Sequence, residues 1–185
     1  INNAPFGVIS VSESTDVIGN NYEPVASVSY SNSDNSYLCT TLSEAIGLAK
    51  GGSTITLLSD IEQADGVVIT DKNITIDLNG KTYTVTEGAS TNNRNFKING
   101  SSVVTIENGT MIAAGNYSSG AYGTLRTEGA ANVTLEGVKL YNYRGNGLNV
   151  KALSGTTVTI IDTEIYSVYG GGVESAGGTV ELTNV

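Results

Sequence analysis

Two basic side chains and one acidic side chain are placed where they can act together on an acidic ligand. Lys97, Arg126 and Glu174 each follow an apolar residue, in the segments FKIN, LRTE and VESA. If these segments are strands on successive turns of one structure, Lys97 and Arg126 lie ~4.8 Å apart. Two cations at that spacing can hold a carboxylate group such as that of an acidic sugar. Lys97, Arg126 and Glu174 are therefore the candidate catalytic residues.

The same segments also allow an interpretation in which these charged residues have no catalytic role. If the apolar residues of these strands face inward, the outward row is Lys97, Arg126, Asn149 and Glu174. Charges that alternate along such a row need no function, because Arg126 can pair with Glu128 or with Glu174 on the surface. Both readings stay open at this point.

Aromatic side chains offer a second kind of site. The chain has 10 Tyr against 2 Phe, and tyrosines gather in its second half. Tyrosine combines a flat apolar face with a polar hydroxyl group, which suits it to stack on sugar rings, although some of these rings can simply cover the ends of the core. The candidate glycan-binding residues are Tyr117, Tyr122, Tyr141, Tyr143, Arg144, Tyr166 and Tyr169.

Metal and cofactor chemistry has little support. The chain has no His and a single cysteine, Cys39, which excludes a Ser-His nucleophile, a His-ligated zinc ion and an internal disulfide. Glu107 and Glu136 face outward one turn apart and can bind Ca²⁺ weakly, but such a pair is more often surface charge. We expect no metal site and no cofactor, with Ca²⁺ as the one alternative.

A repeat near ~25 residues positions all these side chains. Four valines at equivalent places, Val104, Val133, Val158 and Val180, are separated by 29, 25 and 22 residues. Each lies in a short alternating segment such as VVTIE, NVTLE or TVTII, bounded by Gly and Asn. Stacked turns of this kind predict an all-β solenoid, a β-helix, whose flat rows of side chains suit an extended partner.

One helix is expected, at 41–50. In TTLSEAIGLAKGG, Thr41 or Thr40 can cap the first turn, and Glu44 follows in that turn. A short amphipathic helix before the first strand can cover the open end of a solenoid. We therefore divide the chain into an irregular lead-in with short strands at 1–40 and a β-helix with its capping helix at 41–185. Because no cap follows the last repeat, we expect further coils or domains on its C-terminal side.

Charge and hydropathy limit the partners. The formal net charge is −9, which argues against a nucleic acid held by phosphate contacts. No apolar run is long enough to span a membrane, so membrane insertion is not expected. The start of the chain has no signal peptide, and we expect a mature or trimmed segment of a longer protein.

The segments VASVSY, TLSEAIGLAKGGSTITLLSDI and ITIDLNGKTYTV carry a resemblance that spans about residues 25 to 185. They resemble pectate-lyase-like right-handed parallel β-helix modules of bacterial secreted or cell-surface proteins, of the type found in Gram-positive anaerobes. The resemblance implies a right-handed parallel β-helix, and in its enzymes a Lys or Arg base beside carboxylates that bind Ca²⁺ on adjacent coils. No two acidic residues are adjacent in this chain.

These features predict a secreted or cell-surface module without catalytic activity. Its expected role is adhesion or glycan binding, with a polysaccharide or a host or cell-surface glycan as the partner. The alternative is a polysaccharide lyase or glycoside hydrolase that acts on an acidic polysaccharide. Because solenoids of this architecture serve enzymes, adhesins and spacers alike, the fold alone does not choose between them.

Overall fold

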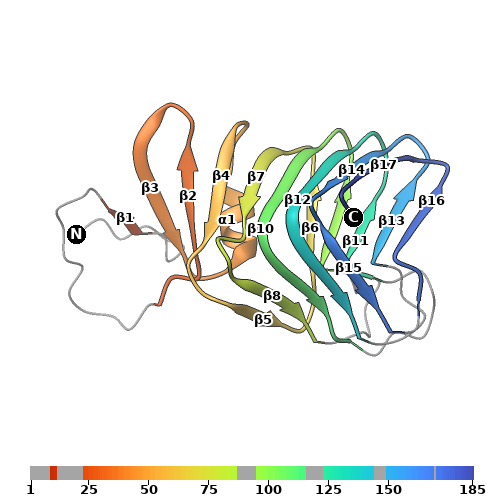
Figure 1. Cartoon of the computed structure of the whole chain (residues 1–185). Helices are drawn as coiled ribbons and strands as arrows, with labels where there is room; N and C mark the ends of the chain where they lie inside the picture. The colour runs from red at the N-terminus through yellow and green to blue at the C-terminus, as the bar shows by residue number, and fades with distance from the viewer. Residues whose placement is uncertain (1–8, 12–22, 87–94, 116–122, 144–148, 169) are drawn as a thin grey trace.

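The computed structural model describes residues 9–11, 23–86, 95–115, 123–143, 149–168 and 170–185. About 60% of them lie in strands, and these strands form a β-solenoid of about 4 turns with one short helix near its N-terminal end (Figure 1). The fold is mostly β, and pairing between successive coils is parallel, which is compatible with the expected parallel β-helix.

The coils present three faces. Face 1 is made of β4 (Ser53–Leu57), β7 (Asn73–Asp77), the first halves of β10 (Val103–Ala113) and β12 (Asn132–Asn142), β14 (Thr157–Ile161) and β17 (Thr179–Thr183). Face 2 is made of β5 (Ile61–Gln63), β8 (Thr82–Val85), the second halves of β10 and β12, and β15 (Glu164–Ser167). Face 3 is made of β6 (Val67–Thr70), β9 (Phe96–Asn99), β11 (Leu125–Thr127), β13 (Val150–Leu153) and β16 (Val173–Ala176).

The register on face 1 confirms the valine repeat. Val104 pairs with Val133, Val133 with Val158, and Val158 with Val180. The first three of these valines are buried, while their outward neighbours are partly exposed. Strand periodicity therefore places one column of apolar side chains inside the coils and leaves the alternate columns outside.

The register on face 3 differs from the prediction at one coil. Val150, not Leu148, pairs with Leu125, so Lys151 and not Asn149 lies beside Arg126. The side chain of Asn149 is buried: it accepts a hydrogen bond from the Thr124 hydroxyl group at 2.7 Å and donates one to the Tyr166 carbonyl at 2.8 Å. The outward placement of Asn149 was wrong because its amide forms these hydrogen bonds to neighbouring coils and is therefore buried.

An antiparallel layer covers the first coil. The strands β1 (Ile9–Val11), β3 (Ser33–Cys39) and β2 (Ala26–Tyr30) pair in that order, and β2 pairs antiparallel with β4. The strand β3 lies in the part of the chain for which the sequence predicted an irregular lead-in with short strands. This layer gives the edge of β4 a hydrogen-bonded partner, and so protects the first parallel strand from pairing with another chain.

The predicted helix is present as α1 (Leu42–Leu48). Thr41 and Glu44 form a reciprocal capping box, in which the Thr41 side chain accepts from the Glu44 backbone N–H and the Glu44 carboxylate accepts from the Thr41 N–H. At the other end the ammonium group of Lys72, from the first coil, donates to the Ala49 carbonyl at 2.8 Å. The N-terminal end of α1 is thus capped within the helix itself, and its C-terminal end is bound to the first coil.

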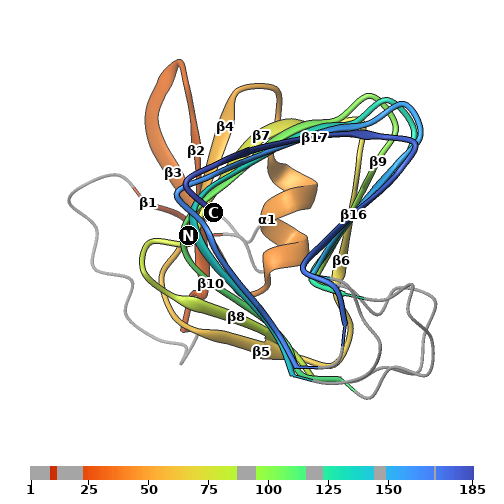
Figure 2. The same ribbon diagram turned by 45° about the vertical axis from the view of Figure 1, so that its right-hand side comes forward.

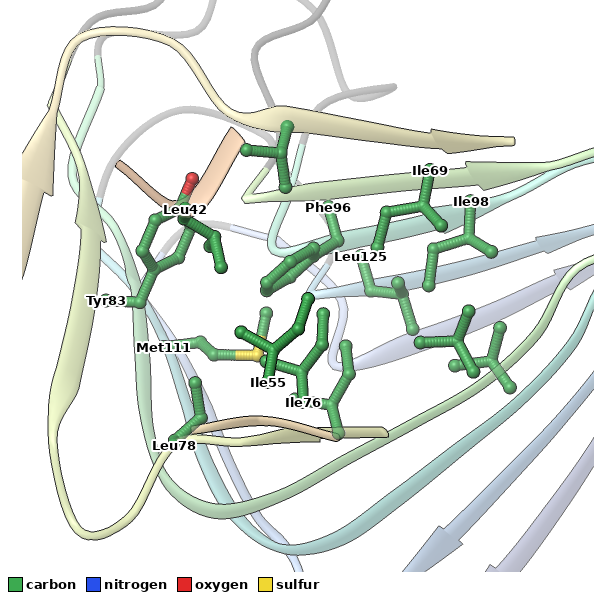
Figure 3. Close-up of a cluster of buried hydrophobic side chains, with 14 of the residues drawn as sticks. Leu42, Ile55, Ile69, Ile76, Leu78, Tyr83, Phe96, Ile98, Met111 and Leu125 are labelled. Atoms are coloured by element: carbon green, nitrogen blue, oxygen red, sulfur yellow. The ribbon is translucent and has the colours of Figure 1, made fainter. Parts of the chain in front are cut away.

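The core runs through the coils and continues into α1. In Figure 2, which looks obliquely along the stack, α1 projects inside the outline of the coils. Figure 3 shows Leu42 of α1 in the same cluster as Tyr83, Phe96 and Ile55, all of them buried. The buried face of α1 also includes Ala45 and Ile46, so the helix closes the apolar cross-section of the first coil.

Candidate functional site

A row of three cations lies on the outer side of face 3. Lys97 is in register with Arg126, Arg126 with Lys151, and Lys151 with Glu174. Lys97 and Arg126 are neighbours, as the sequence predicted. Glu174 is separated from Arg126 by Lys151, so the structure does not bring the three candidate catalytic residues into one group.

Carboxylates neutralise this row. The Glu128 carboxylate lies 2.5 Å from Arg126 Nε and 3.2 Å from Lys97 Nζ, and Glu174 lies 3.0 Å from Lys151 Nζ. Partial burial tends to raise the pKa of Glu128, but the hydrogen bonds and charges of Arg126 and Lys97 outweigh it and hold that pKa below its usual value. The predicted pairing of Arg126 with Glu128 is confirmed, and Glu128 is shared with Lys97.

Three of the candidate tyrosines form a cluster on the outer side of face 2, which we call the tyrosine platform: Tyr141, Tyr143 and Tyr166. The rings of Tyr141 and Tyr143 are stacked, with centroids 5.8 Å apart and an interplanar angle of 5°. Tyr166 stands in register with Tyr141 on the next coil, and its ring is 6.0 Å from Tyr141 and 6.4 Å from Tyr143. Strand register therefore assembles residues from two coils into one aromatic surface.

The platform is open to solvent. Tyr143 is 43% exposed and Tyr166 is 51% exposed, whereas a tyrosine that completes a core is largely buried, as Tyr83 is. Ile112 is in register with Tyr141 on the preceding coil, and Val168, two residues after Tyr166, is 43% exposed. The aromatic surface is thus continued by apolar side chains that no pattern in the sequence singled out.

Polar groups border the platform. The Tyr141 hydroxyl group donates to the Glu164 carboxylate at 3.2 Å, and Lys139 Nζ lies 3.6 Å from the other oxygen of that carboxylate. Local desolvation and the hydrogen bond to Glu164 raise the pKa of Tyr141. A carboxylate beside exposed rings is an arrangement that can accept hydrogen bonds from sugar hydroxyl groups while the rings stack on the sugar.

The remaining predicted glycan-binding residues, Tyr117, Tyr122, Arg144 and Tyr169, lie outside the residues that the structure describes. The platform is therefore defined by Tyr141, Tyr143 and Tyr166 alone.

A row of like charges lies on face 1. Glu107 stands in register between Asp77 on one side and Glu136 on the other. The sequence paired Glu107 with Glu136 but did not predict Asp77 beside them. Within the described part of the chain, no three Asp, Glu or Cys side chains form a group that could hold a metal ion. Burial, followed by the charges of Asp77 and Glu136, raises the pKa of Glu107.

Replacing Glu107 with glutamine should stabilise the protein at neutral pH by about 0.5–1 kcal/mol, because two like-charge contacts are removed. An acid whose pKa is raised by folding costs stability above that pKa, and the cost disappears as the pH falls below the unfolded value. The gain should therefore be present at pH 7 and absent near pH ~3. Urea unfolding of both proteins at the two pH values measures it.

Glu136→Gln is the matched control for this substitution. Glu136 faces Glu107 on one side and Ile161 on the other, so its replacement removes one contact rather than two. Equal gains from both variants would show that Asp77 adds no repulsion, and a loss of stability from Glu107→Gln at pH 7 would show that the row is not repulsive.

Cys39 has no features of a reactive thiol. It is fully buried in β3, and burial, together with the charge of Glu44, raises its pKa to about 11. A thiol that stays protonated and inaccessible serves as a small apolar residue.

Comparisons with protein-family models, curated proteins and solved structures found no match to this chain. In the described part of the chain, no helix combines the length and the apolar character needed to cross a membrane.

Proposed function

We propose that the chain is a non-catalytic module of right-handed, pectate-lyase-like parallel β-helix type that binds glycans on a secreted or cell-surface protein. The observation that carries this proposal is the tyrosine platform, where three rings from two coils meet on the outer side of face 2 and those of Tyr143 and Tyr166 are exposed. Exposed aromatic clusters of this kind mark interaction sites.

The shape of the surface supports a saccharide ligand. The platform lies on strands of a sheet rather than in a closed cavity, and it continues through Ile112 and Val168. Stacking on pyranose C–H groups needs open aromatic surface, and a polymer can extend beyond it along the solenoid. Tyr141 and Glu164 supply a hydroxyl group and a carboxylate at its border.

The ion pairs on face 3 support the absence of catalysis. A lyase base must be free to reach the substrate, whereas Lys97 and Arg126 are both engaged by the Glu128 carboxylate. Glu174 is similarly engaged by Lys151. The alternative, a lyase or hydrolase of acidic polysaccharides, would require these contacts to break before each reaction. Incubation with polygalacturonate, with and without Ca²⁺, should release no unsaturated or reducing ends.

Replacing Tyr166 with alanine should weaken glycan binding about tenfold, because it removes the most exposed ring of the platform and its contacts with both neighbours. The fold should be unaffected, since substitution of an exposed side chain changes the free energy of unfolding by less than about 1 kcal/mol. A glycan array with the purified chain identifies the ligand, and calorimetry with that ligand measures the loss.

Val103→Ala provides the matched control, because Val103 is 46% exposed but lies on face 1. It should bind like the parent protein. If the array retains no plant, host or bacterial glycan, the proposed function fails. If Tyr166→Ala and Val103→Ala bind equally well, glycans bind elsewhere on the chain.

A further inference from the structure

The inference below rests on the proposed function and concerns the chemical class of the glycan. At the border of the platform, the Glu164 carboxylate is held in place from two sides. One oxygen accepts from the Tyr141 hydroxyl group at 3.2 Å, and the other lies 3.6 Å from Lys139 Nζ. The Glu164 side chain is nevertheless 57% exposed, so its oxygens keep lone pairs that face solvent. A sugar stacked on the rings meets this carboxylate as a hydrogen-bond acceptor.

The charges around the platform disfavour an acidic ligand. The charged side chains beside the platform are Glu164, which accepts from the Tyr141 hydroxyl group, and Lys139, whose charge also acts on Tyr141. Lys139 is already paired with Glu164, and the chain as a whole carries −9. A uronate or sulfate group placed beside Glu164 would meet a like charge, whereas a neutral hydroxyl group would donate a hydrogen bond to it.

We propose that the tyrosine platform binds neutral glycans and rejects their acidic counterparts, with Glu164 as the residue that determines this specificity. The rings supply stacking, which depends little on ligand charge, and the Glu164 carboxylate supplies the discrimination.

The experiment compares each neutral glycan that the array retains with its own carboxylated form, made by oxidation of the primary hydroxyl groups. The parent protein should bind the neutral member at least tenfold more tightly. Glu164→Gln keeps the shape of the side chain but removes its charge, so we expect this preference to shrink at least fivefold. Because the discrimination is electrostatic, it should also shrink in ~1 M NaCl.

Glu62→Gln is the control variant. Glu62 is an exposed carboxylate on the same face. In register, Thr84 and Ile112 lie between Glu62 and Tyr141, so Glu62 is ~14 Å from Tyr141. Its replacement should leave the preference unchanged. Equal or tighter binding of the acidic members, or an unchanged preference in Glu164→Gln, overturns the inference while the proposed function stands. An array that retains only acidic glycans also overturns the inference while the proposed function stands. An array that retains no glycan overturns both the inference and the proposed function.

Discussion

Replacing Ile46 with aspartate should lower the free energy of unfolding by roughly 4 kcal/mol and the melting temperature by about 10 °C. Ile46 is 7% exposed and lies on the buried face of α1, which packs against the first coil. The change removes apolar contacts and forces a carboxylate into a place where no basic side chain of α1 can pair with it. Thermal and urea unfolding followed by circular dichroism measures the effect.

The matched control places the same charge at an exposed position of the same helix. Ser43 is exposed in the first turn of α1, where a negative charge is favourable, so Ser43→Asp should leave stability unchanged or slightly raised. If Ile46→Asp melts like the parent protein, α1 does not hold the end of the core. Equal losses from both variants would indicate an effect of net charge rather than of burial.

Much of the architecture could be predicted because it depends on local pattern. The valine series reports which residues face inward, and the structure keeps all four valines in register. The helix was predictable for a similar reason, since Thr41 and Glu44 form a capping box that depends only on their spacing. The part played by Lys72 was not predictable, because it comes from a coil that follows the helix by many residues.

The sequence-based expectations that differ from the structure concern polar residues. Asn149 looks like an outward residue, yet tertiary hydrogen bonds to Thr124 and Tyr166 bury it and shift the register on face 3 by two residues. The strand β3 is rich in Ser and Asn and has little strand propensity, but pairing with β1 and β2 on either side makes it a strand. In both places partners distant in sequence decide the structure.

The candidate site was predictable as a set of residue types but not as a group. Tyrosine enrichment pointed to Tyr141, Tyr143 and Tyr166, while only the register between β12 and β15 brings them together. The importance of Glu164 for this site comes from the Tyr141 hydroxyl group on the adjacent coil, a contact that the sequence does not show. Contacts between coils arise at sequence separations that vary from turn to turn, so they require the structure.

Gly155 occupies a corner of the solenoid where successive coils come too close for any side chain. Its φ is +85°, and a methyl group on it would lie 2.5 Å from the carbonyl oxygen of Gly129 on the preceding coil. Gly129 has a φ of +75° and in turn approaches the backbone of Gly100. At this corner, backbone segments with φ in the left-handed region lie directly on one another. A shift that relieves a clash at one coil therefore displaces the next coil.

Gly155→Ala should accordingly cost about 3–4 kcal/mol, the sum of an unfavourable φ and a backbone clash that no side-chain rotation can relieve. Two other glycines distinguish the cost of the unfavourable φ from the cost of the clash. Gly80 has a φ of +72° but nothing within 4 Å, so Gly80→Ala should cost only about 1 kcal/mol, while Gly51 has neither constraint and should tolerate alanine. Urea unfolding should rank the losses as Gly155, Gly80, Gly51. A Gly155→Ala protein no less stable than Gly80→Ala would mean that the coils can separate at this corner, and that close backbone stacking does not hold the solenoid together there.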